Sequence, residues 1–418
     1  MGSKIKSIKA RQVLDSRGNP TVEVELSTKE FSVLSIVPSG ASTGKHEALE
    51  LRDGDKKRYN GKGVLNAVDN VNRILAKKLA GFDCEKQSQI DNLMIEMDGT
   101  QTKSKLGANA ILAVSMAVCK AGAKSKKMEV FEHIASLAKT KPKMPVPQMN
   151  VINSGKHAGV DNDIQEHMIL PTGFKAFSES LRAGAETYHS LKSILNKKFG
   201  ARATLLGDEG GFAPSIGNVN DRLELLMQAI RESGYSGRIK IGLDCASSEF
   251  YDGNNYTIMG KKYSKGELVD FYNDLSSTFP IITIEDGFSE DDFDGWQMLN
   301  KSLGNKIQIV GDDLLVTNIK RIGMAAQKKL CNALLLKVNQ IGTVTESINA
   351  ADLSYKNKWN VVVSHRSGET EDNFISDVCV GLGARQSKFG APARSERTAK
   401  YNQLLRIEEK YKVKFDGK

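Results

Sequence analysis

The amino-acid sequence predicts an eight-stranded α/β barrel over residues 141–418, preceded by a smaller α+β domain over residues 1–140. In the second part, short apolar runs alternate with helix-like segments at intervals of roughly 30 residues, the size of one βα unit when about 250 residues make eight. These runs are rich in Ile, Val and Leu and end at turn residues, which is typical of parallel strands covered on both faces. A chain of 418 residues is long enough for such a barrel and a second domain.

The first part of the chain begins with a predicted antiparallel meander of two or three strands over residues 5–38. Apolar and polar residues alternate there, as at Val22, Val24 and Leu26, and this period of two indicates a sheet with one exposed face. The sequence Arg-Gly-Asn-Pro at residues 17–20 predicts the first turn.

Helices are predicted to complete the first domain. Apolar residues recur at helical spacing over residues 63–138, and two of these segments end at Gly81 and Gly99. Prolines then interrupt the helical pattern, and we place the domain boundary at this point; they are Pro142, Pro145 and Pro147.

Four predicted barrel strands end in charged residues. In chain order these are Asp244, Glu285 with Asp286, Asp312 with Asp313, and Lys337. The carboxyl ends of barrel strands open onto one face, so these side chains are expected to meet there. Carboxylates from three successive strands suit a hard cation such as Mg²⁺. An acidic residue after a strand is also a common helix N-cap, but its repetition on three strands favours the metal site.

Lys337 is the candidate general base of this face. Burial and a nearby dication both disfavour an ammonium ion, so we expect a lowered pKa for this lysine. Glu209 and Glu166 are the alternative candidates for the acid. A base opposite a metal-bound carboxylate suits removal of the proton alpha to that carboxylate, because the cation stabilises the resulting enolate.

A cationic rim around the metal site indicates a substrate with several negative charges. Arg366 and Ser367 follow an apolar run and resemble a phosphate clamp, with a planar fork beside a hydroxyl. From the pattern alone, His157 and His365 are equally compatible with functional and structural roles, and Lys388 is an ordinary loop lysine. Ser39 lies in a loop of small residues that is either a linker or a source of ligands; its spacing does not match a nucleotide-binding loop.

Composition narrows the class of protein. The net charge of +9 is spread along the chain, which argues against nucleic-acid binding as the main function. Five widely separated cysteines without a CxxC pair argue against a disulfide framework or a zinc site. No apolar run approaches the roughly 20 residues that span a bilayer, and the start lacks the apolar core of a signal peptide. We therefore expect a cytoplasmic enzyme.

Long motifs in the chain resemble the enolase family over nearly its whole length. They include VPSGASTGKHEALELRDGD, GDEGGFAP, IGLDCASSEFY, IVGDDLLVTN, LLLKVNQIGT, VSHRSGETED and GAPARSERTAKYNQLLRIEE. The resemblance implies a barrel of the enolase type and a hydro-lyase, phosphopyruvate hydratase, of glycolysis and gluconeogenesis. This reaction is the Mg²⁺-dependent, reversible dehydration of 2-phosphoglycerate to phosphoenolpyruvate.

The resemblance also assigns roles to individual residues. Lys337 would take the proton from C2, and Glu209, with Glu166 beside it, would help the C3 hydroxyl to leave. Two Mg²⁺ ions are implied, the first held by Asp244, Glu285 and Asp312, and the second approached by Ser39. Substrate phosphate and carboxylate would be bound by His157, His365, Arg366, Ser367 and Lys388, together with Glu166.

Enolases are usually homodimers and sometimes octamers, which makes Arg11 with Glu408 or Glu409 expected interface partners. Two alternatives remain: a superfamily member that acts on a non-phosphorylated acid, and a binding protein that has kept the fold. Nucleic acid or plasminogen would be a partner only in a secondary role.

The chain departs from the usual family sequence at four places, none of which removes a residue assigned to chemistry. Val160 follows His-Ala-Gly where Asn is usual, Gly287 stands where Pro is common, and Ser154 replaces a common glycine. The fourth departure is at residues 383–385, shortly before Lys388.

Overall fold

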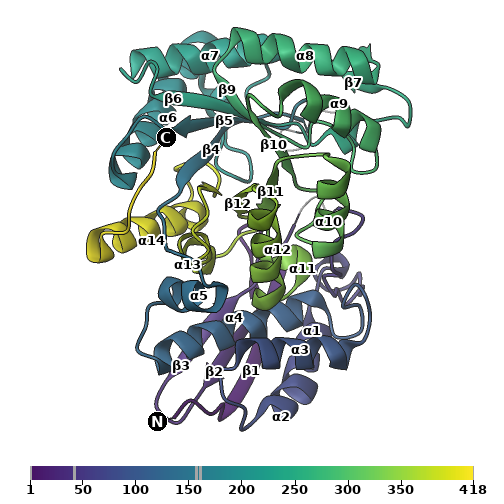
Figure 1. Ribbon diagram of the computed structural model, residues 1–418, viewed down its shortest axis with the longest axis vertical. Coiled ribbons are helices and arrows are strands. Elements are labelled where there is room, and N and C mark those ends of the chain that lie inside the picture. Colours follow the sequence, from purple (N-terminus) through teal and green to yellow (C-terminus); the bar gives the residue numbers. More distant parts are fainter. Residues whose placement is uncertain (1, 41–43, 156–158, 160–161, 418) are drawn as a thin grey trace.

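The N-terminal part contains a three-stranded antiparallel sheet in the order β1-β2-β3. The computed structural model describes residues 2–40, 44–155, 159 and 162–417. The strands are β1 (Ser7–Leu14), β2 (Pro20–Ser27) and β3 (Ser32–Ile36). Val22, Val24 and Leu26 are completely buried, as their alternation with polar residues predicts. The predicted meander is confirmed, and it lies at the lower end of the molecule in Figure 1.

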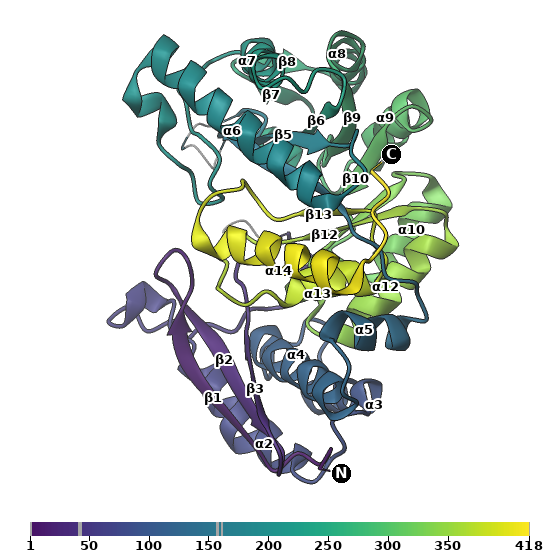
Figure 2. The same cartoon turned by 90° about the vertical axis from the view of Figure 1, so that its left-hand side faces the viewer.

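Helices cover one face of this sheet (Figure 2). They are α1 (Leu65–Asp69), α2 (Ala76–Leu79) and α4 (Ala108–Ser125), with a π-helical segment at Asn70–Leu75 joining α1 to α2. Two further helices, α3 (Gln87–Asp98) and α5 (Val130–Ala138), pack against α4. The central helix, α4, is rich in alanine and buried along almost its whole length. Small side chains let α4 contact β2 and β3 as well as two barrel helices, α11 (Val338–Ile341) and α12 (Val344–Lys356). This helix therefore joins the N-terminal part to the barrel.

The larger part is a closed barrel in the order β10-β11-β12-β13-β4-β5-β6-β9. Its strands are β4 (Val146–Asn153), β5 (Glu166–Pro171), β6 (Ile239–Asp244), β9 (Ile281–Glu285), β10 (Gln308–Gly311), β11 (Ala333–Leu336), β12 (Asn360–Ser364) and β13 (Gln386–Lys388). The strands are buried almost throughout, as expected for strands covered on both faces. The predicted eight-stranded α/β barrel is confirmed.

One strand of the barrel is not parallel to its neighbours. β5 runs antiparallel to both of its neighbours, β4 and β6. The connection from β4 to β5 is short, and its described residues, 154, 155, 159 and 162–165, contain no α-helix. A parallel return needs a longer crossover, usually helical, which is consistent with the antiparallel pairing of β5. The first residue of β5, Glu166, therefore lies at the end of the barrel where its neighbours finish, opposite Asn153 and Asp244.

The remaining helices surround the barrel (Figures 1 and 2). Besides α11 and α12 they are α6 (Phe177–Phe199), α7 (Val219–Glu232), α8 (Lys265–Thr278), α9 (Phe293–Leu303), α10 (Ile319–Lys328), α13 (Phe374–Gly381) and α14 (Ser395–Tyr411). A small two-stranded sheet, β7 (Tyr256–Ile258) with β8 (Lys261–Tyr263), precedes α8. Tyr401, Leu404 and Ile407 of α14 are buried, so the closing helix packs against its neighbours α13 and α6.

Candidate active site

A polar cavity lies at the barrel end where most strands finish. Nine of the predicted site residues line it: Glu166, Glu209, Asp244, Asp312, Lys337, His365, Arg366, Ser367 and Lys388. They come from strand ends and loops that span more than 200 residues of sequence. The other lining residues are Gln165, Ala246, Asp286, Asp313 and Ser364. The predicted convergence of charged residues at this end of the barrel is therefore observed.

Lys388 is the centre of one group of charges. Its Nζ lies 2.7 Å from Asp244 Oδ2, 2.9 Å from Glu285 Oε1 and 3.1 Å from Glu166 Oε2. Burial alone would lower the pKa of Lys388, but the three carboxylates outweigh it and raise this pKa well above its ordinary value. This residue, unremarkable in the sequence pattern, is thus a buried cation that neutralises an acidic cluster.

Lys337 forms a second pair, with Asp312. Its Nζ donates a hydrogen bond to Asp312 Oδ2, and Gln340 Nε2 donates to the other carboxylate oxygen at 2.8 Å. Burial lowers the pKa of Lys337, but the charges of Asp312 and Glu285 oppose it and the net shift is upward. Among these side chains alone, the paired carboxylate therefore outweighs burial. The expected lowering of this pKa depends on a nearby dication as well as on burial, and it stays a prediction for the metal-bound site.

One of the strand-end carboxylates, that of Asp286, holds the backbone of the neighbouring strand end. Both oxygens of Asp286 accept backbone N–H groups, from Asp312 and Asp313, each at 2.9 Å. Asp286 therefore holds the end of β10 in place. Oxygens of Asp286, Asp312 and Asp313 lie within 4.8 Å of one another, and this is the compact acidic group found among the described residues. The sequence pattern left Asp286 and Asp313 as alternatives to their neighbours, and the resemblance selected Glu285 and Asp312.

Glu285 has the environment of a cation ligand. It is buried, and its Oε2 has no hydrogen-bond partner among the described residues, while Oε1 accepts from Lys388. Burial and the neighbouring charge of Asp244 raise the pKa of Glu285 well above its ordinary value. A buried carboxylate oxygen without a donor is costly, and a hard cation would satisfy it. Carboxylate oxygens such as those of Asp244, Glu285 and Asp312 are the ligands that hard divalent cations prefer.

His365 and Glu209 lie together at another side of the cavity. Nε2 of His365 is 3.3 Å from Oε2 of Glu209, which also accepts a hydrogen bond from Asn150 Nδ2 at 3.1 Å. Burial is the main reason that the pKa of His365 falls to about 4, so the imidazole is neutral at pH 7. The neutral imidazole of His365 therefore lies beside Glu209, the candidate acid.

Arg366 lies against residues that sequence reasoning missed. Its guanidinium donates to Glu47 Oε2 at 2.8 Å and to Asn339 Oδ1 at 3.0 Å. Glu47 comes from the loop that follows residues 38–44, far from Arg366 in sequence. A buried arginine requires an anionic partner, but nothing in the spacing of these residues identifies which one.

Ser39 does not line the cavity. Its hydroxyl donates to Asp15 Oδ2 at 2.9 Å and accepts from Arg17 at 3.1 Å. Its backbone pairs with Gly368, which follows Ser367. Ser39 thus joins the N-terminal part to the loop after β12. His157 lies outside the residues that the structure describes.

Comparison with known proteins agrees with this geometry. A family described as "Enolase, N-terminal domain" matches residues 5–134, and "Enolase, C-terminal TIM barrel domain" matches residues 141–418. The chain belongs to the enolase family. Its function is that of an enolase, a hydro-lyase of the phosphopyruvate hydratase type.

Several enolases are similar over nearly the full length. The enolase of Mastigamoeba balamuthi is 54% identical over 420 residues, covering 97% of this chain and 96% of the relative. The enolase of Methanocaldococcus jannaschii is 54% identical over 407 residues, and that of Eimeria tenella 53% identical over 424 residues. Each of these two alignments covers 97% of this chain and 95% of the relative.

One departure from the usual enolase sequence has a structural explanation. Ser154, in place of a common glycine, shares a buried cluster with Asp163 and Arg222 of α7. Arg222 Nη2 donates to Asp163 Oδ1 at 2.6 Å, and Nη1 contacts both Asp163 Oδ2 and the Ser154 hydroxyl. The cluster ties both ends of the β4–β5 connection to α7.

Another departure lies just before β13. Gly383 has a φ of +65°, and a Cβ there would lie 2.6 Å from the carbonyl oxygen of Lys141. A glycine suits this position because it has neither the clash nor the strain of a left-handed conformation.

The described residues contain no helix long and apolar enough to cross a membrane.

Proposed function

We propose that the cavity dehydrates 2-phosphoglycerate reversibly to phosphoenolpyruvate, with Lys337 as the base and Glu209 as the group that assists loss of the hydroxyl. One observation carries this assignment: both residues line the same cavity as the Arg366–Ser367 pair. A base, an acid and a site for phosphate within one cavity are the groups that this elimination requires.

Asp244, Glu285 and Asp312 would hold the first Mg²⁺. Bound there, it would supply positive charge for the dianionic enolate that forms when the C2 proton leaves. A second Mg²⁺ served by Ser39 stays a prediction. Ser39 would first have to give up its hydrogen bonds to Asp15 and Arg17.

The side chains divide the remaining work. Lys337 would accept the C2 proton at Nζ, which requires the proton it shares with Asp312 to be released first. Glu209, with Glu166 near it, would protonate the departing hydroxyl. The anionic ends of the substrate would be bound by Arg366, Ser367, His365 and Lys388, together with His157.

The decisive experiment follows phosphoenolpyruvate formation by absorbance. Purified protein with 2-phosphoglycerate and Mg²⁺ should give a signal that excess EDTA abolishes and added Mg²⁺ restores. A protein that retains its fold but gives no EDTA-sensitive signal would overturn the proposal. The control is the same assay with heat-denatured protein.

The rival within the superfamily is an enzyme for a non-phosphorylated acid. The pairing of Arg366 with Ser367 argues for a phosphorylated substrate. Inorganic phosphate should then compete with 2-phosphoglycerate, raising KM without changing kcat. Turnover of a non-phosphorylated 2-hydroxy acid that phosphate does not inhibit would support the rival.

We also propose a homodimer. The expected interface residue Arg11 already pairs with Glu23 and Glu25 in its own chain, and Glu408 caps the start of α6. Glu409 is exposed and remains the better candidate of the two glutamates. Light scattering coupled to size-exclusion chromatography would distinguish a monomer, a dimer and an octamer.

Two other expectations stay predictions: the domain boundary between residues 140 and 141, and a cytoplasmic location.

A further inference from the structure

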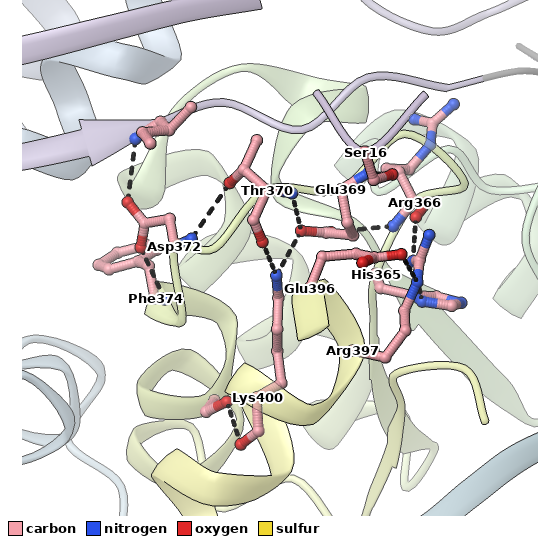
Figure 3. Close-up of polar contacts among 12 residues, drawn as sticks. Ser16, His365, Arg366, Glu369, Thr370, Asp372, Phe374, Glu396, Arg397 and Lys400 are labelled. Atoms are coloured by element: carbon pink, nitrogen blue, oxygen red, sulfur yellow. Dashed lines mark hydrogen bonds and ion pairs between the residues drawn. The ribbon is translucent and has the colours of Figure 1, made fainter. Parts of the chain in front are cut away.

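Two cationic side chains of helix α14, Arg397 and Lys400, point toward the loop after β12, as Figure 3 shows. The side chains of Arg397 and Lys400 are both completely buried. A buried charge is stable only where specific partners replace water. The partners of these two residues therefore identify what α14 holds in place.

Lys400 supports the loop from a distance. Its Nζ lies 2.6 Å from Glu369 Oε2 and donates to the carbonyl oxygen of Thr370 at 2.5 Å. Glu369 in turn accepts the backbone N–H of Arg366 at 3.1 Å. Lys400 thus fixes the backbone of the loop through Glu369, and no hydrogen bond or ion pair is found between Lys400 and His365.

Arg397 spans two loops of the candidate active site. It donates to the carbonyl oxygens of Arg366 at 2.5 Å and Ser367 at 2.6 Å. A further bond, of 3.1 Å, reaches the carbonyl oxygen of Asp208, the residue before Glu209. One guanidinium therefore connects the loop of His365 with the loop of Glu209.

The same guanidinium also contacts the His365 ring. Nη1 of Arg397 lies 2.6 Å from Nδ1 of His365. An arginine side chain has only donors and stays protonated, so Nδ1 must be the acceptor. In a neutral imidazole the hydrogen must then sit on Nε2. Nε2 lies 3.3 Å from Glu209 Oε2, so the ring presents its hydrogen on the side of that carboxylate.

The charged form of His365 is disfavoured in this position. An imidazolium would place a second N–H against the N–H of Arg397. The carboxylates of Glu209 and Glu369 face the ring and favour its charged form, whereas burial and Arg397 oppose it. A Cβ at residue 390 would lie 3.0 Å from Cε1 of the ring, so Gly390, with a φ of +81°, allows this close approach.

We propose that Arg397 is a positioning residue that fixes His365 as the neutral tautomer protonated at Nε2, and so supplies a hydrogen-bond donor to Glu209. Its importance for turnover rests on the proposed function of Glu209. The tautomer itself does not, since it follows from the contacts of His365 alone.

The test is nitrogen NMR of the full chain labelled with ¹⁵N-histidine, with His365→Gln used to assign the signal. In the unsubstituted protein, His365 should carry its proton on Nε2 at pH 7 and stay neutral at pH 5.5. In Arg397→Met, the Nδ1-protonated tautomer should appear, and the ring should titrate nearer its ordinary pKa. An Nδ1 proton in the unsubstituted protein, or an unchanged signal in Arg397→Met, would overturn the proposal.

Two further variants separate this role from a structural one. Arg397→Lys keeps a cationic donor and should keep the Nε2 tautomer, which also provides a test if Arg397→Met does not fold. Lys400→Met removes a buried cation three residues further along α14. A purely structural role predicts that Lys400→Met and Arg397→Met change the His365 signal alike, and that result would contradict the proposal.

Kinetics give a second readout. Arg397→Met should lower kcat at least about tenfold, because a histidine in the wrong tautomer cannot donate to Glu209. Arg397→Lys should recover part of this loss, and failure to recover any of it while the tautomer is restored would contradict the link to turnover. Absence of enolase activity would contradict the proposed function, but it would not affect the tautomer of His365 that NMR measures.

Discussion

Lys388 Nζ lies 2.7 Å from Asp244 Oδ2, although 144 residues separate the two in sequence. The same ammonium group contacts Glu285 and Glu166, so carboxylates from β5, β6 and β9 share one cation. Like charges at this distance repel one another unless a positive charge lies among them. The acidic cluster is therefore built around positive charge, and Mg²⁺ would add to that charge.

Lys388→Met should make the protein depend more strongly on Mg²⁺. The substitution leaves buried carboxylates without their cation, and breaking such a pairing typically costs about 3–5 kcal/mol. Thermal unfolding should show a lower Tm, and millimolar Mg²⁺ should raise the Tm of the variant more than that of the unsubstituted protein. Lys301→Met, at an exposed position on α9, is the control. Equal effects of Mg²⁺ on both proteins would contradict the assignment of the cluster.

Lys337→Ala should abolish most of the activity. Loss of a general base typically lowers the rate at least about a hundredfold, and initial rates of phosphoenolpyruvate formation would measure it. Lys301→Ala should leave kcat unchanged. Circular dichroism would confirm that both variants are folded, and a folded Lys337→Ala with full activity would refute the assignment of the base.

His133 should make the protein less stable in acid. The ring is buried, neither nitrogen has a hydrogen-bond partner among the described residues, and burial lowers its pKa from 6.5 to about 4. Between these values the unfolded chain binds a proton that the folded chain excludes, so this contribution to stability is lost as the pH falls from 6.5 toward 4. His133→Phe should therefore lose less stability between pH 7 and pH 5, measured by urea unfolding.

His189→Phe provides the matched control, since His189 is exposed on α6. It should show the same loss of stability between pH 7 and pH 5 as the unsubstituted protein. If His133→Phe also behaves like the unsubstituted protein, another group carries the pH dependence.

The cluster of Ser154, Asp163 and Arg222 should be important for stability. Arg222→Met leaves Asp163 buried without its cation, which typically costs about 3–5 kcal/mol. The double variant with Asp163→Leu removes both charges and should recover much of that loss. A double-mutant cycle from urea unfolding measures the coupling, and strictly additive losses would show that the two side chains do not depend on each other.

Some site residues were predictable because their positions follow from local pattern. Asp244, Glu285, Asp312 and Lys337 end predicted strands, and the geometry of a barrel brings strand ends together. The division of labour among neighbours was not predictable in this way. Asp286 resembles Glu285 in the sequence, yet its carboxylate holds the backbone of Asp312 and Asp313.

The sequence by itself determined the alternating meander, the apolar barrel strands and the charged residues that end them, because these depend on the spacing of neighbouring residues. Only the tertiary structure decided that β5 runs antiparallel, that Lys388 neutralises three carboxylates, and that Arg366 pairs with Glu47. The physical reason is that a buried charge selects its partner by distance after folding. That distance depends on how the whole chain packs, so the spacing of residues in the sequence does not predict it.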